Sequence, residues 1–226
     1  TLTAEKRKDR SLEEKEACLD VFYIAEKLRD ACEIMIRSRL LRVDHESSLL
    51  QAVLREVEAR PEHYAEAPPV RLYCLLTRGR PEDYERTRQT LEQTAAAFSL
   101  PERKLLYNYL QNFCIQRINQ GRAGYLREVF LLYQTQLEAG LLIEEGRLSE
   151  WHYKNIVTTG IRLREMDWVR RFIEDYRPHL HPEVRDNAYR FNLASLHHAR
   201  GEYDEVLALL TRVEYDHPRY NLGAKA

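Results

Sequence analysis

The sequence has little glycine and proline, with only 8 of each among its 226 residues. Folds built from many short strands need these residues at their tight turns, so a turn-rich β fold is disfavoured. No apolar run approaches the roughly twenty residues that a transmembrane helix requires. A formal net charge of -1 gives no overall attraction for nucleic acid or for anionic lipid. These absences leave an ordinary soluble chain, somewhat rich in charge, as the expectation.

Recognisable catalytic signatures are also lacking. The sequence contains no glycine-rich phosphate loop, no GxSxG, no HExxH and no Cys and His spaced as a nucleophilic pair. His179 and His181 come closest to a metal pair, but no third ligand lies at a useful spacing. We therefore predict a non-enzymatic protein with no catalytic, cofactor-binding or metal-binding residues.

The four cysteines do not form a CxxC motif, and each lies in an apolar helical pattern. This placement predicts reduced thiols that act as small core residues, which favours a cytoplasmic location. The charged first segment lacks the apolar stretch of a secretory signal. Since the sequence begins with Thr1 and not with Met, a signal removed upstream stays open as the alternative. The cysteines are Cys18, Cys32, Cys74 and Cys114.

Apolar residues recur at steps of three and four almost everywhere, and two-residue alternation is nearly absent. This pattern predicts an all-α fold. Helices are expected at about 11–41, 47–60, 69–78, 81–98, 101–119, 124–140, 149–164, 167–176, 182–199 and 203–214.

The first expected helix is long, and Ser11 with Glu14 forms a capping box that predicts its start. The 3-4-3-4 spacing of apolar residues from Cys18 to Met35 also fits a short coiled-coil seam. A helix packed on its neighbour is the favoured interpretation, and a homodimer through this helix is the alternative. The predicted buried face consists of Cys18, Val21, Phe22, Ala25, Leu28, Cys32, Met35 and Ile36.

Glycines are expected just past helix ends, where left-handed backbone is common. The clearest loop is RPEHYAEAPP at 60–69, which predicts a boundary between an N-terminal helix pair at 1–60 and a helical array at 66–226. Residues 138–150 are a second irregular stretch. The glycines at these helix ends are Gly79, Gly121, Gly140 and Gly201.

Four stretches repeat one pattern, in which a helix is followed by a turn marker, an aromatic residue and a second helix. The stretches are 75–91, 115–133, 160–176 and 196–210. Helix pairs that recur about 35 to 45 residues apart are typical of stacked α-solenoids. The turn markers and their aromatics are Gly79 with Tyr84, Gly121 with Tyr125, Met166 with Trp168, and Gly201 with Tyr203.

The clearest unit, Asn192 to Pro218, has Leu193 and Ala194 in its first helix and Gly201 and Tyr203 at its turn. In these residues the sequence resembles the tetratricopeptide repeat family. Two residues depart from the family pattern, since Arg190 stands in place of the usual Trp and Val206 in place of the usual Ala. The apolar places of the second helix and the closing proline are matched by Val206, Leu210, Val213 and Pro218.

The resemblance implies a right-handed α-solenoid of about five antiparallel helix hairpins, preceded by the long N-terminal helix. It also implies a scaffold that binds a protein partner, as a peptide or a helix, in a concave groove lined by the first helix of each pair. The groove residues predicted from it are Asn108, Gln111, Asn112, Lys154, Asn155, Asn187, Arg190, Asn192 and His198.

Two other functions remain open. One is a regulatory sensor domain that binds a small ligand or a signal peptide. The other, weaker alternative is a helical repeat that binds RNA through a cluster of arginines, namely Arg162, Arg164, Arg170, Arg171 and Arg177. Residues 217–226 look like the start of another first helix, so the array is expected to continue beyond Ala226.

Overall fold

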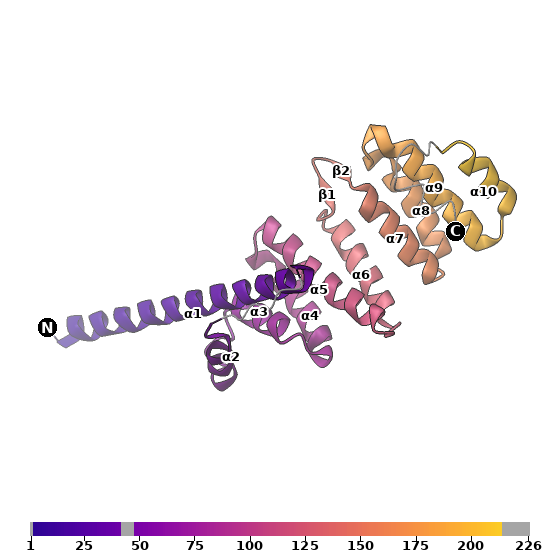
Figure 1. The fold of residues 1–226 in the computed structure, drawn as a ribbon. Helices are drawn as coiled ribbons and strands as arrows, with labels where there is room; N and C mark the ends of the chain where they lie inside the picture. The colour runs from indigo at the N-terminus through magenta and orange to yellow at the C-terminus, as the bar shows by residue number, and fades with distance from the viewer. Residues whose placement is uncertain (1, 42–47, 214–226) are drawn as a thin grey trace. The chain divides into compact units, whose positions relative to one another are not determined.

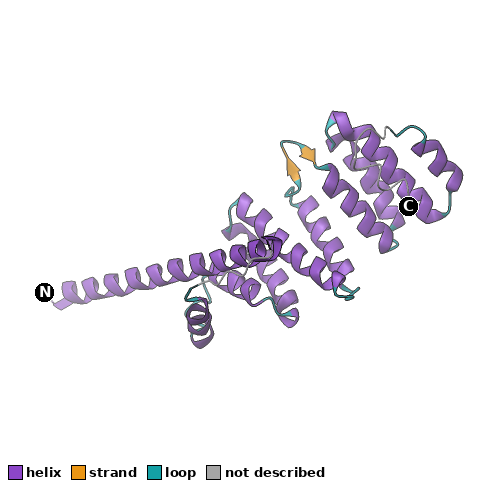
Figure 2. Ribbon diagram, viewed as in Figure 1, coloured by secondary structure: helices purple, strands orange, loops and turns teal. Residues whose placement is uncertain are grey.

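The computed structural model describes residues 2–41 and 48–213, and in them the chain is all-α. These residues form ten α-helices and one small two-stranded hairpin (Figure 2). None of the described helices is both long and apolar enough to cross a bilayer. The expected helix start at residue 47, the closing Pro218 and the further unit at 217–226 lie outside the described residues.

The chain divides into two compact units, residues 1–110 and 111–226. The boundary expected between residues 60 and 66 therefore falls inside the first unit. The first unit contains α1 (Leu2–Leu41), α2 (Leu50–Ala59), α3 (Pro68–Arg78) and α4 (Tyr84–Thr94), with 3-10 turns at Pro81–Asp83 and Ala95–Ala97. Helix α5 (Leu100–Asn119) contains the division between the units. The second unit continues with α6 (Tyr125–Glu138), β1 (Ile143–Glu144), β2 (Arg147–Leu148), α7 (Glu150–Arg162), α8 (Met166–Tyr176), a 3-10 turn at Arg177–His179, α9 (Pro182–Arg200) and α10 (Tyr203–Leu210).

Helix α1 begins at Leu2, so the predicted start at Ser11 is wrong. Ser11 lies within the helix and is exposed. The preceding residues are mostly Ala, Glu, Lys and Arg, which favour helix and contain no glycine or proline to stop it. A capping-box pattern can therefore occur where no helix end exists.

The C-terminal half of α1 packs on α3, and its N-terminal half extends beyond α2 and α3 (Figure 1). Leu28 and Cys32 are buried as predicted, and the Cys32 Sγ lies 3.1 Å from the Thr77 Oγ1. The predicted burial of Cys18 and Phe22 is wrong, because α3 does not cover that part of the helix and both are exposed. Of the remaining predicted positions, Val21, Ala25 and Met35 are half-buried, and the side chain of Ile36 is outside the described residues.

This packing places two residues of the predicted coiled-coil seam, Leu28 and Cys32, in the core of the first unit. That part of the seam is therefore unavailable for a homodimer. Cys74 and Cys114 are buried as well, so three of the four cysteines are core residues and Cys18 is not. Burial raises the pKa of the Cys32 thiol to about 12 and also raises the pKa of Cys74.

In the second unit α7, α8 and α9 pack on one another, α6 packs on α7, and α10 packs on α9. Tyr153 of α7 is fully buried, and its hydroxyl donates to the carbonyl of Ile173 in α8 at 2.7 Å. Burial is the main reason why the pKa of Tyr153 is raised. The ring of Trp168 stacks on Phe172 at a centroid distance of 5.4 Å, which continues this core along α8.

The joint between α7 and α8 turns at Arg164, not at the predicted Met166. Arg164 has a φ of 60°, and Met166 is already the first residue of α8. The amide of Glu165 donates to the Gly160 carbonyl and that of Arg164 to the Ile161 carbonyl, which is the Schellman pattern. An arginine in this position gives no sequence signal, so the marker was assigned two residues too late.

The irregular stretch after α6 contains an antiparallel hairpin in which Ile143 pairs with Leu148 and Glu144 with Arg147. The two loop residues, Glu145 and Gly146, both have positive φ, as a type I′ turn requires. Two residues per strand are too few to produce a recognisable alternation. The hairpin places the buried Leu148 in the core just before α7.

Candidate protein-interaction surface

Helices α7 and α9 are held at their first turns by side chains that accept backbone N–H bonds. The Ser149 hydroxyl accepts the amide of His152 at 3.2 Å, and the His181 Nδ1 accepts the amide of Glu183 at 3.4 Å. Pro182 occupies the first position of α9, where a missing N–H costs nothing. These caps position the two helices that carry most of the predicted groove residues.

His181 is thus a helix cap, and His179 lies with its Nδ1 3.1 Å from the Gly146 carbonyl oxygen. The two histidines serve local structure in different places. Among the residues that the structure describes, no group of three His, Cys, Asp or Glu side chains could hold a metal ion.

Lys154 and Phe191 join α7 to α9 on a partly exposed surface. The Lys154 Nζ lies 5.5 Å from the centroid of the Phe191 ring, within reach of a cation–π attraction. No carboxylate pairs with this ammonium group in the described parts of the chain. We call the partly exposed side chains on these two helices the α7–α9 surface, and define it as Lys154, Asn155, Asn187, Arg190, Phe191 and His198.

The other members of the α7–α9 surface differ in what they contact. Asn155 is exposed, and it partly offsets the rise that burial causes in the pKa of Tyr133 of α6. Asn187 is half-buried, one turn before Phe191 on the same helix. His198 is exposed, and its ring meets the Tyr203 ring edge-on at 5.8 Å. The surface therefore combines two amides, two cations and aromatic rings.

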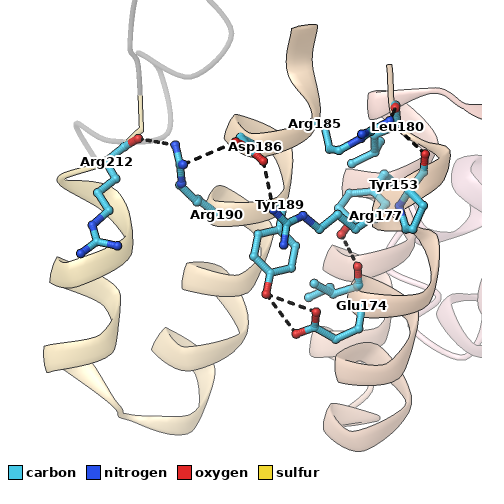
Figure 3. A network of polar contacts seen from close by, with 11 residues as sticks. Tyr153, Glu174, Arg177, Leu180, Arg185, Asp186, Tyr189, Arg190 and Arg212 are labelled. Carbon is cyan, nitrogen blue, oxygen red and sulfur yellow. Dashed lines mark hydrogen bonds and ion pairs between the residues drawn. The ribbon is translucent and has the colours of Figure 1, made fainter. Parts of the chain in front are cut away.

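Arg190 belongs to a polar network that crosses from α8 to the end of α10 (Figure 3). Its Nη1 donates to the Arg212 carbonyl at 2.8 Å, and its Nη2 lies 3.6 Å from the Asp186 carboxylate. Asp186 also pairs with Arg177 at 3.1 Å. Arg190 is consequently committed to intramolecular partners, which fix its position.

The same network continues to Tyr189 and Glu174. The guanidinium of Arg177 lies over the Tyr189 ring, 4.2 Å from its centroid, and the Tyr189 hydroxyl donates to Glu174 at 3.1 Å. Burial raises the pKa of Tyr189, and Glu174 adds to this rise. Arg170 also pairs with Glu174, at 3.2 Å. Two of the five clustered arginines are therefore neutralised by carboxylates, which weakens the case for a basic RNA-binding patch.

Two predicted groove residues are core residues instead. Asn192 is 3% exposed, and its side-chain amide donates to the Ala188 carbonyl one turn earlier at 2.8 Å. Gln111 is also buried. Neither side chain is presented to a ligand, so including them in the groove was wrong. Helical spacing alone could not decide this, because both residues border the buried face of their helix.

The remaining predicted groove residues, Asn108 and Asn112, lie on α5. Both are exposed, and with Leu105 and Ile115 they form a continuous stripe at steps of three and four residues. Asn108 belongs to the first unit and Asn112 to the second.

Several residues near the surface were not predicted as functional, namely Phe191, Asp186, Tyr189 and Glu174. Phe191 follows Arg190 directly, and an aromatic residue on a first helix is a signal that sequence reasoning could have used. The pairs of Asp186 with Arg190 and of Glu174 with Arg170 are each four residues apart on one helix, so helical spacing could have suggested them. The contacts of Asp186 with Arg177 and of Glu174 with Tyr189 join separate elements, and no local spacing predicts them.

Comparison with known proteins gives no relative. No family model matches the chain, and neither the curated proteins nor the solved structures contain a significant match.

Proposed function

We propose that this chain is a non-catalytic protein-interaction scaffold that binds an acidic peptide across the α7–α9 surface. In this proposal its helices form a solenoid of antiparallel hairpins similar to tetratricopeptide repeats. The packing of α9 on both α7 and α8 supports it, because stacked hairpins require the first helices of neighbouring pairs to touch.

The observation that carries the proposal is the ammonium group of Lys154 beside the ring of Phe191. A lysine that lacks a carboxylate partner within the described residues can form a charge-assisted bond with a ligand carboxylate. The adjacent ring offers apolar area to a peptide side chain.

Arg190 has a different role in this proposal. Its bonds to Arg212 and Asp186 use its donors within the unit, and the bond to the Arg212 carbonyl holds the middle of α9 against the residues that follow α10. We therefore assign peptide contact to Lys154 and Phe191, and positioning of the helix to Arg190.

The test begins with selecting binders from a random displayed peptide library on the immobilised chain. The affinity of a selected acidic peptide is then measured by fluorescence anisotropy. Replacing Lys154 with Ala should weaken binding about tenfold or more, since a hydrogen bond to a charged group is worth about 1.5–3 kcal/mol. Phe191→Ala should also weaken it.

Arg122→Ala is the matched control, because Arg122 is an exposed cation of the same unit outside the surface. It should leave the affinity unchanged, and circular dichroism should show equal helix content in all variants. Equal peptide affinity of the Lys154 and Arg122 variants would refute the proposal. Salt-sensitive binding of mixed oligonucleotides in place of peptides would favour the RNA alternative.

A further inference from the structure

The exposed part of α1 carries large apolar side chains that no described residue of the first unit covers. Leu12, Leu19 and Phe22 are 59%, 57% and 66% exposed. Single exposed apolar residues are common, but a row of them along one helix marks an interaction site.

These residues lie on a regular stripe. Leu12, Lys15, Leu19 and Phe22 follow one another at steps of three, four and three residues, and Glu26 and Arg29 extend the series by four and three. This is the spacing of the contact positions in a two-helix coiled coil. The stripe differs from the seam expected between Cys18 and Met35, whose Leu28 and Cys32 are buried in the first unit.

A groove runs beside this stripe. It has a volume of about 570 Å³, and its walls are formed by α1 and by residues that include Pro69 and Tyr73 of α3. Phe22, Glu26 and Arg29 belong to both the stripe and the groove lining. A helix laid on the stripe would therefore also cover the opening of the groove.

We propose that the occupant is a second copy of this chain, which pairs its own α1 with this stripe in the antiparallel direction. The stripe is complementary to itself in that direction. When Leu19 of one copy faces Phe22 of the other, Lys15 faces Glu26 and Leu12 faces the aliphatic stem of Arg29. Each pairing occurs twice in the dimer, because the two copies are related by a two-fold axis.

Charge decides the direction of pairing. In a parallel dimer each residue would face its own copy, so Lys15 would meet Lys15 and Glu26 would meet Glu26, which is repulsive. The antiparallel register replaces these contacts with two attractive ones. Glu26 already pairs with Arg29 on its own helix, and both side chains stay partly exposed at 36% and 42%.

The experiment is sedimentation velocity on the full chain across the micromolar range. We expect a dimer of twice the 26.9 kDa chain mass. Lys15→Glu alone and Glu26→Lys alone should each weaken the dimer at least about tenfold, because each places like charges opposite one another. The double variant carrying both changes should regain much of the wild-type affinity.

This rescue cannot arise within one chain, because the two positions are eleven residues apart on one helix, a distance of about 16 Å. Phe22→Glu should give a monomer, and Glu13→Lys, an exposed change to one side of the stripe, is the control for net charge. A wild-type monomer, or a dimer whose single and double charge variants dissociate equally, would overturn the proposal. The proposal is independent of peptide binding by the second unit, so either can fail alone.

Discussion

Gly160 of α7 lies where α8 and α6 approach this helix closely. A Cβ atom at this position would overlap the Val169 Cγ2 of α8 and lie 3.2 Å from the Phe130 Cε2 of α6. Val169 and Phe130 are both buried, so neither can move into solvent. We expect Gly160→Ala to lower the free energy of unfolding by about 1–3 kcal/mol, measured by urea denaturation.

Gly124 provides the matched control for that substitution. A Cβ atom there would meet nothing within 4 Å, and its φ of -55° suits any residue. Gly124→Ala should leave stability unchanged or raise it by a few tenths of a kcal/mol, since Ala restricts the unfolded chain. Equal destabilisation by both changes would show that helix approach at Gly160 is not the cause.

At the residue scale the sequence predicted which residue types lie on helices more reliably than which side chains are exposed. Lys154 and Asn155 were placed on a first helix, and the structure leaves both partly or fully exposed. Asn192 was assigned to the groove by the same reasoning and is buried. Whether a side chain at such a position is exposed depends on where the neighbouring helices pack. The apolar period of one helix does not give this information.

At the scale of single elements, the joint between α7 and α8 holds a non-glycine residue in left-handed backbone. This conformation costs roughly 1–2 kcal/mol for a residue with a Cβ atom, and Arg164 is exposed. We expect Arg164→Gly to raise the unfolding free energy by about 0.5–1 kcal/mol, because the relief of strain exceeds the added chain entropy. Thermal and urea denaturation would measure it.

The joint between α9 and α10 supplies the reverse control. Gly201 has a φ of 78° and the same hydrogen-bond pattern, with the Glu202 amide donating to the His197 carbonyl. Gly201→Ala should therefore lower the free energy of unfolding by about 1 kcal/mol, because alanine is strained in this backbone conformation. A loss of stability in Arg164→Gly would contradict this expectation. It would mean that the arginine side chain stabilises the fold by more than the left-handed backbone strain at this residue costs.

Helix ends show what a sequence can and cannot provide at this scale. Gly79, Gly121, Gly140 and Gly201 have positive φ at or just beyond helix ends, as predicted, because glycine adopts this conformation without strain. The start of α1 and the turn at Arg164 were misplaced. In the first case a cap pattern occurs inside a helix, and in the second the turn residue is one that usually avoids left-handed backbone.

For the whole molecule, the all-α class followed directly from the period of the apolar residues. The division after residue 110 could not be found in this way, because it falls inside the uninterrupted α5. The network between α8, α9 and α10 could not be predicted either, since it joins residues such as Arg190 and Arg212 that are 22 positions apart in the sequence. Both features depend on which helices meet, and local patterns do not encode this.

Amide hydrogen exchange of the chain with and without a selected acidic peptide tests the central claim most directly. If the α7–α9 surface binds the peptide, residues of α7 and α9 should gain protection, while α2 and α4 in the first unit should not change. Protection confined to the first unit, or none in α7 and α9 at saturating peptide, would contradict a binding surface built on those two helices.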